Sequence, residues 1–177
     1  MKRNAMADRD TLAAKLAARP GWPLVAGKKH ILKNLERQLQ EGEEIADLLD
    51  GLVPGEDGAS PGVEGVLFLT AKRLLFIPGA GMKSAAVSIP HNRLRDAACR
   101  RGVSSFTVTF SGRDSRIAFA TFAGDSTVRG FLDTLVGFSG IAGVTQSRAD
   151  APDTALWDMT GIRSIHGSSA GEDAKRA

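Results

Sequence analysis

The sequence predicts a mainly β (α+β) fold: a seven-stranded antiparallel sandwich or open barrel, capped by a C-terminal helix and preceded by an N-terminal helical extension. Three observations support this prediction. Twenty glycines in 177 residues separate short apolar runs, which indicates many turns between short strands. Apolar and threonine side chains alternate over 106–110, the period of a half-buried strand. An amphipathic helix pattern then follows the last predicted strand, over 125–136.

The order of elements follows from the same patterns. Helices are predicted over 8–19 and 28–40, because Pro20-Gly21-Trp22-Pro23 must break any longer helix. The continuous apolar run over 66–70 predicts a strand that is buried on both faces. In the last helix, Arg129 and Asp133 lie four residues apart and are expected to pair. The predicted strands are 45–53, 66–70, 73–78, 86–89, 94–100, 106–110 and 117–122.

These patterns divide the chain into three parts. Residues 1–40 form the helical extension, 41–144 the β-rich domain, and 145–177 a tail that we expect to be partly disordered. The single cysteine, Cys99, excludes an internal disulfide. The N-terminal residues contain no apolar leader, and the longest apolar stretch, 131–144, is shorter than the roughly 20 residues that span a bilayer. We therefore expect a cytoplasmic location.

A hairpin motif at residues 65–76 (GVLFLTAKRLLF) carries a family resemblance. It combines a glycine, an apolar strand, a threonine, two residues, an arginine and a second apolar strand. Together with Glu41-Gly42-Glu43-Glu44-Ile45 before it and Ser88-Ile89-Pro90 after it, this stretch resembles the bacterial pleckstrin-homology-like domains of the YokE type, which are similar in shape to GRAM domains. The resemblance, over 41–138, implies two near-orthogonal sheets and a C-terminal helix. It implies no activity, because this fold hosts many binding roles.

Basic residues at strand ends form the first candidate site. The loop at 54–62 (PGEDGASPG) holds no basic residue, unlike the corresponding loop of phosphoinositide-binding relatives. In a meander, alternate turns point to the same end, which places a candidate patch for an anionic partner opposite that loop. It consists of Lys72, Arg73, Arg93 and Arg113. The alternative is that these charges keep strand ends soluble, with Arg73 paired to Glu64 across the hairpin.

Apolar residues outside the β-rich domain form the second candidate site. Ile31, Leu35 and Leu39 share one helix face, and Trp157 lies in a short apolar cluster of the tail, 156–159 (LWDM). Such side chains need cover, so they are candidates for self-association or docking. Alternatively, the helix packs on its own domain, or its basic face lies on an anionic membrane.

The sequence offers no catalytic, cofactor or metal site. Cys99 is interpreted as a small buried hydrophobe, and the histidines share no recognised zinc spacing. Phe106, Phe110 and Phe119 fall at core spacing, so nucleic acid is not expected as a partner. We interpret the chain as a noncatalytic interaction module that mediates protein–protein contact or self-association. The alternative is a peripheral membrane module that binds anionic lipid through the basic strand ends.

Overall fold

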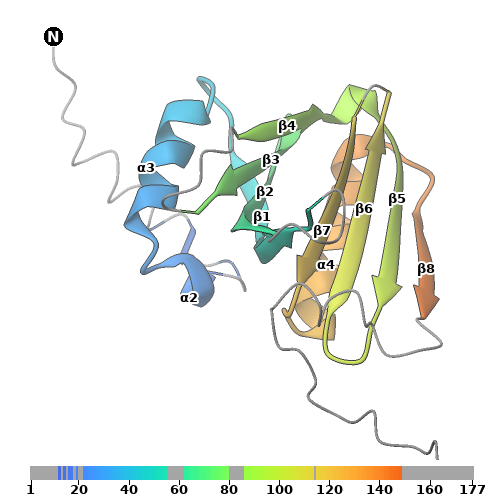
Figure 1. Ribbon diagram of the computed structural model, residues 1–177. Helices are drawn as coiled ribbons and strands as arrows, with labels where there is room; N and C mark the ends of the chain where they lie inside the picture. The colour runs from blue at the N-terminus through green and yellow to red at the C-terminus, as the bar shows by residue number, and fades with distance from the viewer. Residues whose placement is uncertain are drawn as a thin grey trace, which may run out of the picture.

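The computed structural model describes residues 12, 14, 16, 17, 19, 22–55, 62–79, 86–113 and 115–148. Within them, eight strands form one sheet in the order β4-β3-β2-β1-β7-β6-β5-β8. Figure 1 shows a short α2 and a longer α3 beside β1–β4, while α4 lies against β5–β7. No helix in these ranges is long and apolar enough to cross a membrane.

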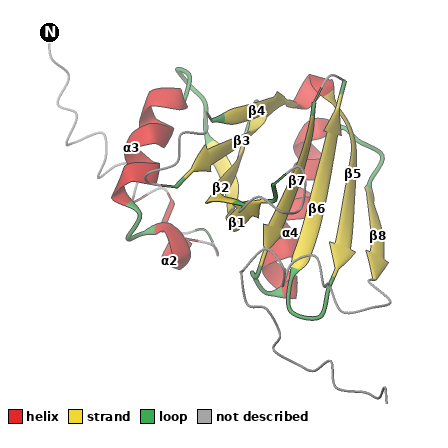
Figure 2. Ribbon diagram, in the orientation of Figure 1, coloured by secondary structure: helices red, strands yellow, loops and turns green. Residues whose placement is uncertain are grey.

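The helix predicted over 8–19 lies mostly outside the described residues. The other predicted elements are present with changes of boundary (Figure 2). They are α2 (Trp22–Val25), α3 (Lys29–Gln38), β1 (Ile45–Val53), β2 (Val63–Thr70), β3 (Arg73–Pro78), β4 (Val87–Pro90), the 3-10 helix η1 (His91–Arg93), β5 (Leu94–Arg101), β6 (Phe106–Gly112), β7 (Arg116–Thr121), α4 (Asp125–Ser139) and β8 (Val144–Arg148). The mainly β architecture with a closing helix and a helical extension is confirmed.

Two elements were missed by the sequence patterns. Helix α2 begins at Trp22 and so overlaps the predicted break at 20–23. Its Pro23 is compatible with this, because proline is tolerated in the first turn of a helix. Strand β8 adds an eighth strand, so the count of seven is wrong. It pairs in parallel with β5, and four of its five residues are exposed, which leaves no alternating pattern to detect. Residues 145–148 are thus strand rather than tail, and 149–177 lie outside the described residues.

Strand β2 is buried on both faces, as the apolar run at 66–70 predicts, and β3 is buried in the same way. One face contributes Leu67, Leu69, Leu74 and Phe76 to a core that α4 and β5–β7 complete. The other face contributes Val66, Phe68, Leu75 and Ile77 to a second cluster, which the N-terminal extension covers. Strands β2 and β3 therefore lie between two apolar layers, and the extension packs on its own domain.

This packing places the candidate docking residues. Ile31 and Leu35 are fully buried against the second face of the sheet, and Leu39 is half-buried beside them. Their apolar side chains are covered by the chain itself and are not free to contact a second copy. Trp157 lies outside the described residues.

Two glycines let aromatic rings approach the sheet closely. Gly51 and Gly65 lie opposite each other on β1 and β2. A Cβ atom on Gly65 would lie 2.4 Å from the Ile77 carbonyl oxygen and 2.6 Å from the Phe76 ring, and one on Gly51 would lie 2.1 Å from the Ala120 carbonyl oxygen. The rings of Phe76 and Phe119 meet edge to face, 6.0 Å apart, over this gap. Because Gly51 and Gly65 have no side chain, Phe76 of β3 and Phe119 of β7 can pack together in one core.

Gly65→Ala should destabilise the fold by about 1–3 kcal/mol, because the added methyl group must displace a buried ring or a backbone carbonyl. Gly130→Ala is the matched control. Nothing lies within 4 Å of a Cβ there, and alanine favours a helix interior over glycine by about 1 kcal/mol. Urea unfolding followed by circular dichroism measures both. A Gly65→Ala protein as stable as the parent would contradict this account of the core.

Candidate functional site

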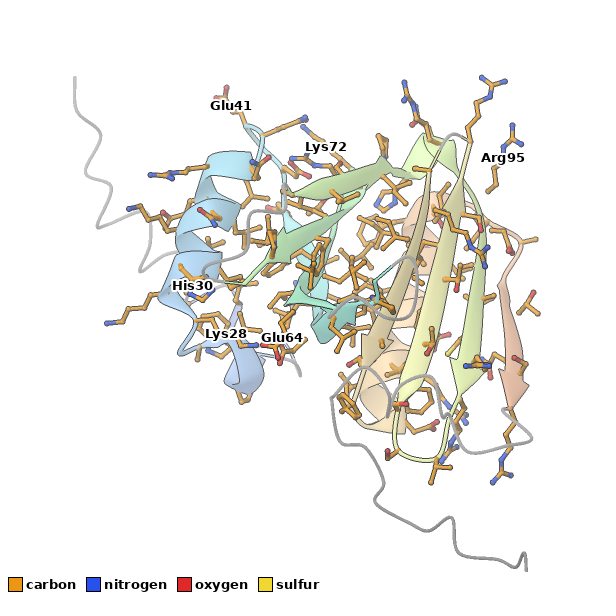
Figure 3. All side chains as sticks on the ribbon, in the orientation of Figure 1. Lys28, His30, Glu41, Glu64, Lys72 and Arg95 are labelled. Carbon is orange, nitrogen blue, oxygen red and sulfur yellow. The ribbon has the colours of Figure 1, made fainter. Side chains whose placement is uncertain are left out.

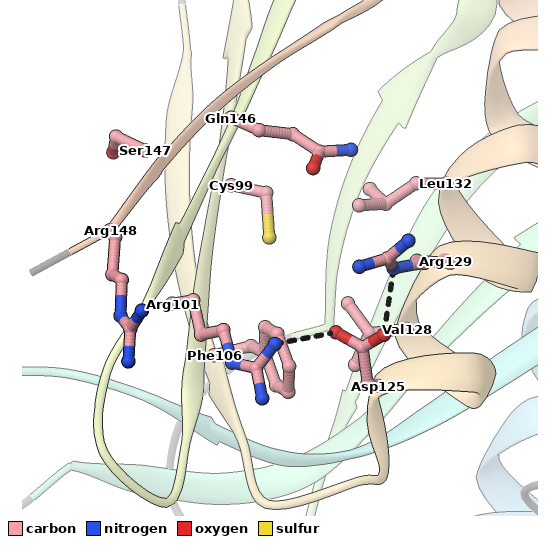
Figure 4. A pocket seen from close by; sticks show the side chains of 10 residues that line it. All are labelled: Cys99, Arg101, Phe106, Asp125, Val128, Arg129, Leu132, Gln146, Ser147 and Arg148. Carbon is pink, nitrogen blue, oxygen red and sulfur yellow. Dashed lines mark hydrogen bonds and ion pairs between the residues drawn. The ribbon is translucent and has the colours of Figure 1, made fainter.

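A groove of about 400 Å³ opens between α4 and the strands β5, β6 and β8 (Figure 4). Its apolar side chains are Cys99, Phe106, Val128 and Leu132. Its polar side chains are Arg101, Asp125, Arg129, Gln146, Ser147 and Arg148. Of the ten lining residues, three carry a guanidinium and one a carboxylate, so the groove favours an anionic ligand.

Strand register and helix periodicity bring these residues together. Arg101, the last residue of β5, lies directly across from Phe106 on β6 and from Arg148 on β8. The first turns of α4 bury Val128 and Leu132 on their inner side. Arg129, on the flank of the helix, therefore faces the strand-end arginines across the groove, as Figure 4 shows.

Two of the three groove arginines, Arg101 and Arg129, share the carboxylate of Asp125. Arg129 Nε lies 2.7 Å from Asp125 Oδ2, and Arg101 Nη1 lies 3.4 Å from Asp125 Oδ1. The prediction that Arg129 pairs with Asp133 is wrong, because Arg129 pairs with Asp125. An acidic residue is better stabilised in the first turn of a helix, where the backbone dipole is positive. The side chains of Arg101 and Arg129 are 55% and 61% exposed, so water screens these ion pairs and each contributes only about 0–1 kcal/mol. The guanidinium groups can thus exchange partners at low cost.

Cys99 lies at the inner side of the groove, and the residue is 7% exposed. Its burial, and secondarily the charge of Asp125, raise the pKa of this thiol above its usual 9.0. The thiol is therefore protonated at neutral pH and is a poor nucleophile. Within the described ranges, no group of three histidine, cysteine or acidic residues could hold a metal ion.

The predicted basic patch is only partly assembled. The backbone N–H of His91 donates to the Lys72 carbonyl, and that of Arg113 donates to the Arg93 carbonyl, both over 3.1 Å. Lys72, Arg93 and Arg113 thus lie on neighbouring turns at one end of the sheet. Lys72 Nζ also donates to the carbonyl of Glu41, beside which Figure 3 shows it.

Arg73, the fourth residue of the predicted patch, is held in a buried ion pair. Its Nε and Nη2 atoms donate to the two carboxylate oxygens of Glu43 over 2.8 and 2.9 Å, and Nη2 also donates to the Gln38 carbonyl. The side chains of Glu43 and Arg73 are 0% and 13% exposed. The proposed partner Glu64 is wrong, because it lies at the other end of the hairpin, beside Gly79. Arg73 therefore fastens the end of α3 to β3.

The ionisation of Glu43 couples this ion pair to pH. Burial opposes the charge of the carboxyl, but hydrogen bonds from Arg73, the Gln40 amide and Thr70 outweigh it, so the pKa is lowered from 4.5. A carboxyl whose pKa is lower in the folded chain stabilises the fold above its unfolded pKa and loses this effect as the pH falls. The contribution of Glu43 should be complete above about pH 4.5 and decline below it.

Glu43→Gln should lower the free energy of unfolding by about 3–5 kcal/mol at pH 7, because it leaves Arg73 without its buried partner. The gap between parent and variant should narrow as the pH falls below about 4.5. Glu41→Gln, at an exposed position nearby, is the control and should be close to neutral. Urea unfolding across the pH range measures all three proteins. If the difference in the free energy of unfolding between the parent and Glu43→Gln does not change with pH, the charge of Glu43 does not contribute to stability.

Comparison with known proteins reveals similarities of shape. No protein-family model matches the chain, and no curated protein matches it. Similar solved structures include the Spt16D Pob3N heterodimer (10% identity, 75% of this chain and 65% of that chain, TM-score 0.45) and the Vps36 N-terminal PH domain (16%, 58% and 83%, 0.44). A duf1696 family protein with a pleckstrin-homology domain from Shewanella loihica is also similar (16%, 64% and 93%, 0.43). The chain thus spans just under two thirds of the first of these.

These similarities extend to shape and give no function. Seven antiparallel strands followed by one helix is the order that the sequence patterns predict, and the closing helix is the one that the pleckstrin-homology-like resemblance implies. The described strands are joined in one sheet, in which a single pair, Leu52 with Ala120, links β1 to β7. The chain has a pleckstrin-homology-like fold, to which an N-terminal helical extension and an eighth strand are added.

Proposed function

We propose that the chain is a noncatalytic interaction module of the bacterial YokE-type pleckstrin-homology group, which binds an acidic segment of a partner protein in the groove between α4 and β8. The observation that carries this proposal is the lining of the groove, three guanidiniums and one carboxylate around apolar side chains. Guanidinium groups form paired, charge-assisted hydrogen bonds with carboxylates. Arginine and aromatic side chains also dominate the energetics of many protein interfaces.

The form of the groove favours a protein segment over a small reactive substrate. Its outer side is the exposed strand β8, so a chain can lie along it. The protonated Cys99 thiol lacks the charge that a nucleophile needs. The exposed arginines keep their hydration until a partner replaces it, which suits a reversible contact.

An anionic lipid surface is the alternative partner. The observation that favours it is the clustering of Lys72, Arg93 and Arg113 on neighbouring turns. Under this alternative, the chain sediments with vesicles that contain phosphatidylserine and not with pure phosphatidylcholine, and Arg93→Gln with Arg113→Gln abolishes the difference. Sedimentation with neither kind of vesicle contradicts it.

The groove is tested with a fluorescent peptide that carries several glutamates around one phenylalanine. Arg129→Gln and Arg148→Gln should each weaken its binding about tenfold, since a hydrogen bond to a charged group contributes about 1.5 kcal/mol. Arg95→Gln removes an exposed charge from β5 outside the groove and is the matched control. Fluorescence anisotropy gives the affinities.

Added salt should weaken the binding of the acidic peptide, and a lysine peptide of the same length should not bind. The proposal fails if the parent protein does not bind the acidic peptide, or if Arg95→Gln weakens it as much as the two groove variants do.

A further inference from the structure

Strand β8 forms one edge of the sheet in the part of the chain that the structure describes. It is the last strand in the sheet order, so within the described ranges only its inner edge has a strand neighbour, β5. Its five residues pair with β5 in unbroken register. Because successive backbone groups of a strand point to alternate sides, the outer edge carries N–H and C=O groups that face away from the sheet.

This edge has little protection against strand addition. Natural sheet edges are blocked by proline, by charges, by bulges or by short length. Strand β8 is short, with five residues, but 144–147 (VTQS) contain neither proline nor charge, its one charge is Arg148 at the end, and the register shows no bulge. The opposite edge of the sheet, β4, is shorter, with four residues, and ends in Pro90. A further strand can therefore pair with β8 more readily than with β4.

The free edge borders the groove. Gln146, Ser147 and Arg148 of β8 line it, and Arg129 stands across from them on α4 (Figure 4). A strand added beside β8 would turn every second side chain toward the face of the sheet on which α4 lies. Carboxylates at alternate positions of that strand would come close to the guanidinium groups of Arg148 and Arg129.

We propose that the acidic partner segment binds as a ninth strand on the free edge of β8, with alternate carboxylates directed to the groove arginines. This inference rests on the proposed function and specifies how the segment is held. Main-chain hydrogen bonds along the edge supply much of the affinity, and the arginines select the sequence. The expected recognition pattern is an extended segment with acidic residues two positions apart.

A second copy of the chain is the competing occupant of this edge. Two copies of β8 paired antiparallel around a twofold axis at Gln146 would place Arg148 opposite Val144. Such a pair brings no carboxylate from β8 to the groove, because residues 144–148 contain none. Charge complementarity therefore favours an acidic partner over a second copy.

The test is a backbone scan of the same glutamate–phenylalanine peptide, with each N–H replaced in turn by N-methyl. Methylation should weaken binding about tenfold at every second position and little at the positions between, since only alternate N–H groups face β8. A matched series that replaces each glutamate by glutamine should show the same two-residue period. Both peptide series are measured on the parent protein, so they do not depend on whether a variant folds.

The outcomes separate the inference from the proposed function. A two-residue period in both series supports strand addition. A peptide that depends on Arg129 and Arg148 but tolerates methylation at every position overturns it and leaves the proposed function standing. If the unmodified peptide does not bind, the proposed function fails first. If light scattering shows a dimer that Gln146→Lys dissociates, the edge belongs to a second copy and the inference is overturned.

Discussion

Strands β2 and β3 carry apolar side chains on both faces, and the rest of the molecule is arranged to cover them. A strand with one solvated face needs a single core, whereas these strands need two. Strands β5–β7 and α4 cover one face, and the N-terminal extension covers the other. Since Ile31 and Leu35 are fully buried in the second cluster, the extension is part of the packed structure and not a separate arm.

Charge fixes how the extension sits on that second face. Apolar packing alone is nondirectional, but the Glu43 carboxylate accepts hydrogen bonds from Arg73 on β3, from Thr70 on β2 and from the Gln40 backbone. A buried ion pair adds little net stability once desolvation is counted, and its effect is to disfavour arrangements that separate the two charges. In this chain it sets the position of the end of α3 relative to the β2–β3 turn. The same pairing removes Arg73 from any surface patch.

The sequence shows where side-chain patterning decides the structure and where it does not. The alternation over 106–110 predicts β6, and the apolar run over 66–70 predicts two-sided burial, because in both places burial selects the residues. Strand β8 is exposed and is held by backbone pairing, which any sequence without proline can supply. The partner of Arg73 is thirty residues away in sequence, so the nearer Glu64 was a reasonable but wrong expectation. The groove is lined by four elements, α4, β5, β6 and β8. It could not be predicted from the sequence, because the pairing of β8 with β5 has no side-chain pattern.

The groove is a consequence of the widths of helices and strands. A helix with its side chains is about 10 Å across, and neighbouring strands lie about 4.8 Å apart, so one helix covers roughly two strands of a sheet. Helix α4 closes the core with Val128, Phe131 and Leu132, while β8 extends the same sheet beyond β5. The added strand therefore reaches past the cover that the helix provides. The residues on either side of the resulting groove border water, which is where arginine side chains remain hydrated and available to a partner.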